Sequence, residues 1–340
     1  MFSRLGLALM ALIAAAGPVY ATEYSFTTID DPDGIPGTTS LLGINNSGAV
    51  LGTFIDSSQV VHGFVLSGGV FTTITVPSSL AAPGETIGNT LPGGINDSGV
   101  VAGTYAVNGG VGSHGFVDAG GSFSAIDVPS TLSTPGNSVA PATTEVNGIN
   151  LAGTLVGQYS TSDVHGFATS HGFVDTGGTF TAIDAPGATQ GTFIAGIANS
   201  GALVGGYFDS VTQHSFIDIG GVFTPVVDPV AAALGDPTLA AGINDVGDIV
   251  GDYTDSAQEF FGFVDIGGVF TPIQDGVAGQ TFVNGINDAG VIVGQFTDSA
   301  SIHGFIATPV AATVPEPASL ALLASGLLGL GLMGRRKRSR

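Results

Sequence analysis

The sequence predicts an all-β protein, a six-bladed β-propeller whose blades are four-stranded antiparallel sheets, and two observations favour this fold class. First, Gly-Ile-Asn or a near copy recurs at intervals of 43 to 54 residues, starting at Gly43, Gly94, Gly148, Gly196, Gly242 and Gly285. Periods of this length are typical of propeller blades. Second, each repeat holds four short segments separated by Asn-, Asp- or Ser-Gly and Gly-Gly pairs, which favour hairpin turns.

The second segment of each repeat alternates strictly, as a strand with one buried face does. Its second residue is aliphatic, its fourth is glycine and its sixth is Phe or Tyr, as in Val50, Gly52 and Phe54. Alternation with a period of two places these three residues on one face. A glycine in the middle of a strand indicates that something approaches closely, and we expect the neighbouring blade to be that partner.

The fourth segment indicates how the ring closes. It occurs five times, around Phe71, Phe123, Phe180, Phe223 and Phe270, whereas the sixth repeat stops after His-Gly-Phe-Ile-Ala-Thr-Pro. The missing copy lies at the other end of the chain, because Tyr24–Pro32 matches Gly177–Pro186. We therefore expect the N-terminal strand to complete the last blade. An open β-array, the alternative architecture, needs no such shared blade.

The two ends of the chain predict export. Residues 1–21 have a charged start, an apolar stretch and a small-residue exit, which predicts a helical signal peptide that signal peptidase cuts after Ala21. A first transmembrane helix is the weaker alternative because the apolar stretch is short. At the other end, residues 314–340 contain an apolar transmembrane helix, Leu320–Gly334, and then a basic stop-transfer cluster, Arg335, Arg336, Lys337 and Arg338. The helix is barely long enough for a bilayer, which favours a transient membrane anchor.

This C-terminal segment resembles the PEP-CTERM sorting signal of Gram-negative bacteria. Pro315, Glu316 and Pro317 supply the motif, and the apolar helix and the basic cluster follow in the family's order. The resemblance implies recognition by an exosortase, release from the inner membrane near the motif, and delivery to the cell surface or extracellular matrix. A simple C-terminal membrane anchor is the alternative. Residues 22–313 between the two ends form the predicted ectodomain.

The repeats themselves resemble HAF-type bacterial extracellular repeats, with His-Gly-Phe where the family name indicates His-Ala-Phe. The similarity extends over almost the whole ectodomain, and it implies an exported surface protein without defining any chemistry. The ectodomain also holds none of the six Lys and Arg residues of the chain, although the chain has 27 Asp and Glu. A body without cationic side chains cannot neutralise a phosphate backbone, so nucleic acid is excluded as a partner. The chain has no cysteine, and its 44% hydrophobic content argues for a buried core.

The histidines are the first candidates for a metal site. All six lie directly before the Gly-Phe or Ser-Phe of one segment, at His62, His114, His165, His171, His214 and His303. Equivalent residues on different blades lie too far apart to share one ion, and the fifth repeat has Phe261 at this position. We therefore expect partly buried structural rings that bond to neighbouring turns.

Repeated carboxylates are the second candidates, and they point to calcium as the alternative cofactor. They form two groups, one after the second segment and one after Gly-Ile-Asn: Asp56, Asp209, Asp255 and Asp298, and Asp97, Asp245 and Asp288. Oxygen ligands suit calcium, but Asp is also a common turn former and no known calcium-loop spacing is present. We predict no metal site and no cofactor, and expect diffuse cation binding by the acidic body.

Catalysis is predicted to be absent. Glu85 and Glu145 lie in the two longest insertions, where two carboxylates could serve glycoside hydrolysis, but solvated loop charges are the simpler interpretation. No catalytic residue is therefore assigned. The sequence predicts a non-enzymatic protein of the cell surface or biofilm matrix, which binds matrix polysaccharide or surface proteins in adhesion. A calcium- or neutral-glycan-binding module is the first alternative, and a polysaccharide hydrolase or lyase the second.

Overall fold

The computed structural model describes most of the repeat region and almost nothing of the two ends. The described residues are 23–108, 112–132, 143–162, 168–255, 257, 259–274, 279–298 and 301–310. Tyr24–Pro309 forms one compact unit, and the predicted signal helix, Ala21 and the C-terminal helix all lie outside the described residues. Within the described residues, no helix combines the length and apolar character that crossing a membrane requires.

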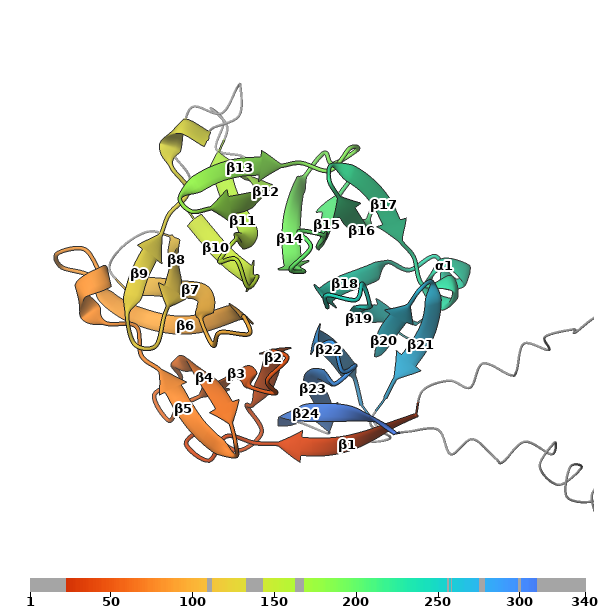
Figure 1. Ribbon diagram of the computed structural model, residues 1–340, viewed down its shortest axis with the longest axis horizontal. Helices are drawn as coiled ribbons and strands as arrows, with labels where there is room; N and C mark the ends of the chain where they lie inside the picture. Colours follow the sequence, from red (N-terminus) through yellow and green to blue (C-terminus); the bar gives the residue numbers. More distant parts are fainter. Residues whose placement is uncertain are drawn as a thin grey trace, which may run out of the picture. The chain divides into compact units, whose positions relative to one another are not determined.

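The compact unit is all-β and propeller-like, with antiparallel sets of strands arranged around a common centre (Figure 1). Set 1 contains β2 (Ser40–Ile44), β3 (Val50–Ile55), β4 (Val61–Ser67) and β5 (Val70–Ile74). Set 2 contains β6 (Thr86–Ile95), β7 (Val101–Asn108), β8 (Ser113–Asp118) and β9 (Phe123–Ile126). Set 5 contains β18 (Thr238–Ile243), β19 (Ile249–Thr254), β20 (Phe260–Ile266) and β21 (Val269–Ile273). In each set the first strand lies innermost and the fourth lies at the rim (Figure 1).

Sets 3 and 4 share a single eight-stranded sheet. Set 3 contains β10 (Thr143–Ile149), β11 (Leu155–Ser162), β12 (Ala168–Thr176) and β13 (Thr179–Ile183). Set 4 contains β14 (Gly191–Ile197), β15 (Leu203–Phe208), β16 (Gln213–Ile219) and β17 (Val222–Val226). The expectation of six separate four-stranded sheets is therefore wrong here, since four four-stranded sheets and one eight-stranded sheet are present. In this sheet Ser170 of β12 pairs in parallel with Gly191 of β14, and the extra His-Gly-Phe copy at residues 165–167 lies outside the described residues.

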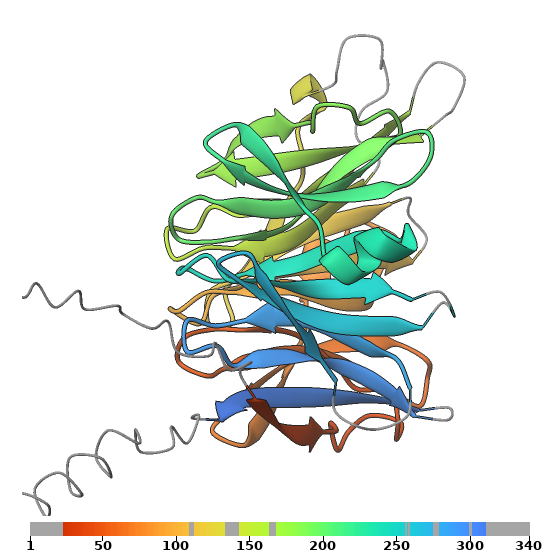
Figure 2. The same ribbon diagram turned by 90° about the vertical axis from the view of Figure 1, so that its right-hand side faces the viewer.

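The N-terminal strand closes the ring, as the displaced fourth segment predicts. Set 6 contains β1 (Glu23–Ile29), β22 (Thr281–Ile286), β23 (Ile292–Asp298) and β24 (Ser301–Val310), in the order β1-β24-β23-β22. The two ends of the repeat region therefore lie side by side in one sheet (Figures 1 and 2). His303 of β24 also bonds to the carboxylate of Asp30, with 2.8 Å between Nδ1 and Oδ1.

Helical structure is confined to the connections between sets. The short helix α1 (Pro229–Leu234) joins sets 4 and 5, and two 3-10 turns, η1 (Ser78–Leu80) and η2 (Ser130–Leu132), follow sets 1 and 2. Asp228 caps α1 by accepting the N–H groups of Val230 and Ala231, and Gly235 ends it in the left-handed conformation. These connections differ in length and composition, whereas the strands they join are near copies.

The mid-strand glycine of the second strand serves its own sheet, which corrects the expectation that it meets the neighbouring blade. A Cβ on Gly103 would lie 2.6 Å from the Cα of Pro92 and 2.9 Å from the ring of Phe116, both within set 2. The close approach follows from a β-bulge in the innermost strand, where the register shifts between Pro92 and Gly94. The glycine of His-Gly-Phe is the one that meets the next set: a Cβ on Gly115 would lie 2.6 Å from Cγ2 of Val146.

The hydrophobic core is divided among the spaces between consecutive sets. One cluster joins Leu51 and Ile74 of set 1 to Ile95, Tyr105 and Phe116 of set 2. Equivalent clusters of buried side chains occupy the other junctions, including those between sets 5 and 6 and between sets 6 and 1. Each sheet therefore buries apolar area only by packing against both neighbours, so an incomplete ring exposes two of these faces.

The closing strand should accordingly carry a large share of the stability. Phe26 of β1 packs on Phe305 with 5.4 Å between ring centroids, and it joins the cluster between sets 5 and 6. We expect Phe26→Ala to lower the free energy of unfolding by about 3 kcal/mol. Thr27→Ala, on the exposed face of the same strand, should change it by less than about 0.5 kcal/mol. Chemical denaturation of both variants measures the difference, and equal effects would contradict closure by β1.

Candidate functional site

The innermost strands of the six sets surround a cavity of about 710 Å³. Its walls are mainly glycine, alanine and aliphatic side chains, to which the Gly-Ile pair of every repeat contributes. The glycines allow the innermost strands to come close: a Cβ on Gly285 would lie 3.0 Å from the Cα of Gly43 in the next set. The glycine therefore recurs because neighbouring innermost strands approach too closely at that position for a larger side chain.

The asparagine of Gly-Ile-Asn joins neighbouring sets. In set 1, the Oδ1 atom of Asn45 accepts the N–H groups of Ser47 and Ala49, while its Nδ2 donates to the carbonyl oxygen of Asn96 at 2.9 Å. Asn96 repeats the arrangement with Asn150 as its acceptor. One side chain thus holds its own turn and the start of the next set. Donation to the next carbonyl also occurs at Asn244 and Asn287.

Set 4 departs from this pattern. Ala198 stands where the other sets have asparagine, so it has no side chain to donate to set 5. Ser200 supplies part of the missing interaction, because its Oγ accepts the Ala202 N–H at 3.3 Å. The turn is therefore held locally, while this side-chain link between consecutive sets is lost.

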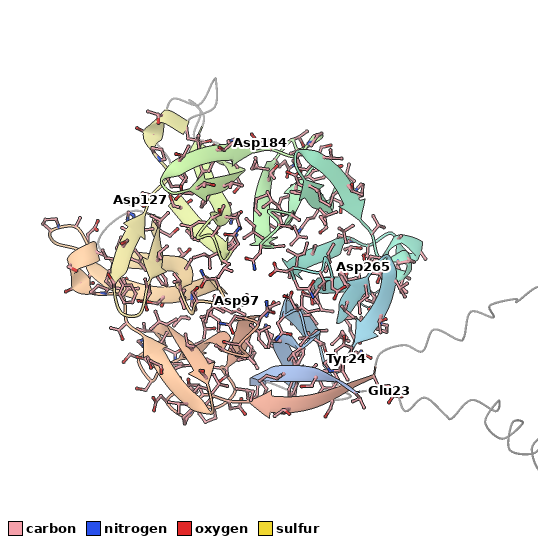
Figure 3. The ribbon with its side chains drawn as sticks, viewed as in Figure 1. Glu23, Tyr24, Asp97, Asp127, Asp184 and Asp265 are labelled. Carbon is pink, nitrogen blue, oxygen red and sulfur yellow. The ribbon has the colours of Figure 1, made fainter. Side chains whose placement is uncertain are left out.

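The next residue of each repeat, polar in every set except set 3, which has Leu151, forms a rim around a smaller pocket, and Asp97 lies near the centre of the ring (Figure 3). Backbone N–H groups of one set donate to side chains of the next, as Asn46 donates to Asp97 at 2.8 Å and Asp245 to Asp288 at 2.9 Å. The amide of Asn46 also donates to the carboxylate of Asp288, at 2.8 Å. These aspartates are therefore engaged in hydrogen bonds between sets.

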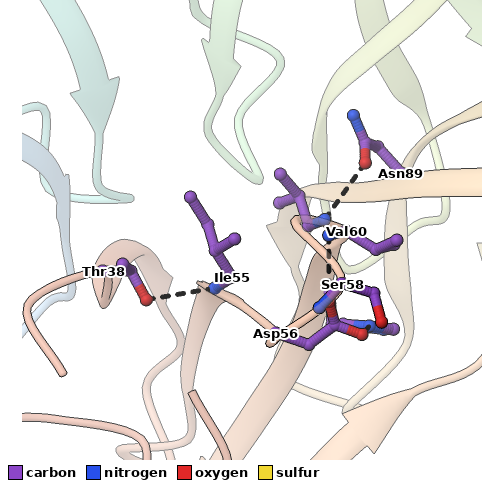
Figure 4. Close-up of polar contacts among 8 residues, drawn as sticks. Thr38, Ile55, Asp56, Ser58, Val60 and Asn89 are labelled. Atoms are coloured by element: carbon purple, nitrogen blue, oxygen red, sulfur yellow. Dashed lines mark hydrogen bonds and ion pairs between the residues drawn. The ribbon is translucent and has the colours of Figure 1, made fainter. Parts of the chain in front are cut away.

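A calcium site gains no support from these carboxylates. Within the described ranges, no three His, Asp or Glu side chains gather closely enough to hold a metal ion. The second group of aspartates forms local turns instead, since Asp56 accepts the N–H groups of Ser58 and Val60 (Figure 4). These bonds and one from His62 lower the pKa of Asp56, which keeps it ionised.

The histidine column is confirmed as structural for the five residues that the structure describes; His165 lies outside the described part. Each ring stacks on the aromatic residue of the second strand, as His114 does on Tyr105 with 5.4 Å between centroids. Each also bonds to an aspartate, at Asp56, Asp127, Asp184, Asp209 or Asp30. Asp127 and Asp184 lie at the rim of the ring (Figure 3). Residues 22–313 hold no Lys or Arg, so histidine is the basic side chain with which these aspartates pair in the described part of the repeat region.

Of the two glutamates considered as an acid-base pair, Glu145 departs from the expected loop position and Glu85 does not. Glu145 lies in β10, where it lines the central cavity and accepts a hydrogen bond from Gln158, and it is not a loop residue. Glu85 lies in a turn before β6, accepts the Ala82 N–H, and does not line the cavity. The structure therefore gives no pair of carboxylates facing a common substrate space at these positions.

A second carboxyl group, which the sequence analysis missed, lines the cavity. Asp252 in β19 is 7% exposed and accepts the Val283 N–H of set 6 at 2.7 Å. Burial raises the pKa of Asp252 to about 8, and the hydrogen bond from Val283 opposes this only partly. Thr104 occupies the equivalent position in set 2, and its Oγ1 likewise accepts an N–H of the next set, that of Val146, at 3.0 Å. The role of Asp252 is therefore to join two sets.

The motif residues Pro315, Glu316 and Pro317 and the basic cluster lie outside the described residues. Residues 313–338 match the family model described as the PEP-CTERM protein-sorting motif, which marks an exosortase-sorted, exported protein. This match bears out the sorting signal predicted at this end of the chain. No curated protein matches the sequence.

Several solved structures are similar to the repeat region at low identity. The Aleuria aurantia lectin in complex with Fucα1-6GlcNAc is 16% identical over 83% of this chain and 100% of the lectin, with a TM-score of 0.48. The Trypanosoma rangeli sialidase in complex with 2,3-difluorosialic acid is 9% identical over 85% of this chain and 59% of its own, with a TM-score of 0.48. A streptogramin B lyase is 12% identical over 83% and 97% of the two chains, with a TM-score of 0.42. At these values the similarities assign no activity to this chain.

The missing asparagine of set 4 provides a test of the link between sets. We expect Ala198→Asn to raise the free energy of unfolding by about 1 kcal/mol, because the new amide can donate to the start of set 5. Ala198→Asp is the matched control, since a carboxylate can hold its own turn but cannot donate. Denaturant titration compares the two, and an equal gain in both would show that the link contributes nothing.

Asp252 predicts a pH dependence of stability. Its carboxyl titrates near pH 3.9 in an unfolded chain but keeps its proton up to about pH 8 in the fold. The unfolded chain therefore binds fewer protons between these values, and the free energy of unfolding falls as the pH rises from about 4 to about 8. Asp252→Asn should remove this fall and be more stable at pH 7, by on the order of 4 kcal/mol. Thermal unfolding at pH 4, 6 and 8 measures it, and an unchanged slope in the variant would contradict the assignment.

Proposed function

We propose that this protein is a non-enzymatic substrate of exosortase that is displayed at the cell surface or in the extracellular matrix, where its repeat region mediates adhesion or matrix interaction. The observation that carries the proposal is the sorting motif at residues 313–338. In this proposal, residues 1–21 are a signal peptide removed after Ala21, residues 22–313 are the ectodomain, and residues 314–340 form the transient anchor.

We further propose that the ectodomain works as a six-bladed propeller, in which sets 3 and 4 act as two blades despite their shared sheet. Two features support this count. Only the parallel bridge between Ser170 and Gly191 connects β12 to β14, and a separate hydrophobic cluster fills the space between these two sets, as it does at the other junctions. The assignment of the blades to HAF-type repeats stays a prediction.

A role in adhesion agrees better with the polar side chains than catalysis does. The repeated asparagines, histidines and aspartates are engaged in hydrogen bonds within and between sets, so they serve the ring. No Lys or Arg is present in residues 22–313 to stabilise an anionic intermediate. Glu145 and Asp252 both line the cavity, but each already accepts a hydrogen bond, from Gln158 and from the Val283 N–H, so the hydrolase alternative is less favoured.

The sorting step can be tested by a single substitution. We expect Glu316→Ala to leave the protein in the inner membrane, because the proposed exosortase site is altered, whereas the wild-type protein reaches the surface or the medium. Ser319→Ala, two residues beyond the motif, is the matched control and should be released normally. Cell fractionation followed by immunoblotting measures both, and release of the Glu316 variant at the wild-type level would refute exosortase processing.

A further inference from the structure

One junction of the ring contains a pocket of about 310 Å³ between sets 4 and 5. Tyr207 and His214 of set 4 line it on one side, and Asp236, which follows α1, lines it on the other. Gln213 and Pro225 also line the pocket. The volume is at the lower end of the range found for small-molecule sites, which is about 300–1,000 Å³.

The pocket lies where the connection before set 4 lacks the covering turn that sets 2 and 3 have. In sets 2 and 3, the aromatic residue of the second strand is covered by the preceding 3-10 turn: the Tyr105 hydroxyl donates to the Leu80 carbonyl, and the Tyr159 hydroxyl donates to that of Leu132. Both tyrosines are at most 1% exposed. The connection before set 4 has no such turn, and Tyr207 is only partly buried.

The connection before set 4 forms part of the pocket wall through Ala185 and Pro186. The N–H groups of Thr189 and Gln190 both donate to the Phe208 carbonyl, which fastens the segment to the end of β15. A Cβ at Gly187 would lie 3.8 Å from Cε2 of Tyr207, an ordinary contact distance, so the connection reaches the edge of the ring. Within the described residues, the Tyr207 hydroxyl forms no hydrogen bond, in contrast to its counterparts in sets 2 and 3.

The polar groups of the pocket are fixed before any ligand arrives. His214 stacks on Tyr207 with 4.8 Å between centroids and bonds to Asp209 at 2.9 Å. Asp209 is held in turn by the N–H groups of Val211 and Thr212. On the opposite wall, the Asp228 N–H donates to Oγ1 of Thr238, which closes the loop that carries Asp236. The Asp236 carboxylate has no hydrogen-bond partner among the described residues, so its acceptor atoms are open to a ligand.

We propose that this pocket binds a single neutral sugar residue at the end of a glycan. A pyranose ring has an apolar C–H face, which suits the stacked rings and Pro225, and hydroxyl groups at its edge, which suit Asp236, Gln213 and the Tyr207 hydroxyl. Anionic sugars are disfavoured because the wall carries Asp236 and no cationic side chain of Lys or Arg. The assignment rests on the proposed function, since it gives the adhesive surface a ligand class.

Binding can be measured on the full-length protein by saturation-transfer-difference NMR. The probes are the methyl glycosides of glucose, galactose, mannose and a 6-deoxyhexose, with methyl glucuronide as the anionic probe. We expect at least one neutral glycoside to bind and the glucuronide to give no signal. Absence of binding by every neutral glycoside, or equal binding of the glucuronide, would overturn the proposal.

Variants locate the site. We expect Tyr207→Phe and Asp236→Asn each to weaken binding of the positive probe about tenfold, since each loses one hydrogen bond to the sugar. Tyr207→Ala should abolish it, with the circular dichroism spectrum recorded to establish folding. The matched control is Tyr105→Phe, which removes the same hydroxyl under the covering turn of set 2 and should leave affinity unchanged. Wild-type affinity in Tyr207→Phe and Asp236→Asn would overturn the site.

The outcome separates this site from the sorting proposal. If the wild-type protein reaches the surface but binds no neutral glycoside, the sugar site is wrong and the sorting proposal stands. If the protein binds the sugar while the Glu316→Ala variant is released normally, the sugar site stands and exosortase processing is wrong.

Discussion

The bifunctional asparagine of the repeat is the interaction on which the ring depends. Residues 22–313 contain no Lys or Arg, so sheets cannot be joined by the usual ion pairs, and without cysteine they cannot be joined by disulfides. A buried amide has both an acceptor and donors, and Asn45 uses them to hold its own turn and the start of the next set. An aspartate can do only the first of these tasks, and a serine is too short to span the gap. The constraint therefore selects Asn at this position, with Gly-Ile before it to line the narrow centre.

Departures from the repeat are informative because each is partly compensated nearby. In set 2, Oγ1 of Thr104 accepts the N–H of the next set's innermost strand. Set 4 has Gly206 at this position, and the hydroxyl moves to the paired residue of the third strand: Oγ of Ser215 accepts the Ala240 N–H at 2.9 Å. In set 4, glycine therefore replaces the hydroxyl residue of the second strand, and serine replaces the glycine of His-Gly-Phe in the third strand. Thr104 places a hydroxyl between sets 2 and 3, and Ser215 places one at the equivalent position between sets 4 and 5. The interaction between sets therefore matters more than the residue that supplies it.

The sequence was sufficient for the features that depend on the period of the repeat. The strands follow from the alternation of side chains, and the closure by Tyr24–Pro32 follows from the displaced copy of the fourth segment. The structural histidines follow from their recurrence at one position of the repeat. The sequence did not predict which neighbouring strand each closely packed residue contacts. Gly103 could face its own sheet or the next one, and only the bulge beside Pro92 decides between them. Likewise, Asp252 is one polar residue among the varied fifth positions of the second strand, and its burial between two sets is a property of the assembled ring.

The same reasoning locates function in the connections between sets. If the repeated polar residues are already satisfied by the ring, a ligand can use only groups that the repeat leaves open. Such groups arise where a connection departs from its equivalents, since the strands themselves are near copies. The turns before sets 2 and 3 carry Leu80 and Leu132 and close over Tyr105 and Tyr159, whereas the connection before set 4 leaves Tyr207 open. If the proposed sugar site is right, a propeller of near-identical repeats gains a binding site where a connection lacks the covering turn, with no change to the interactions that hold the ring together.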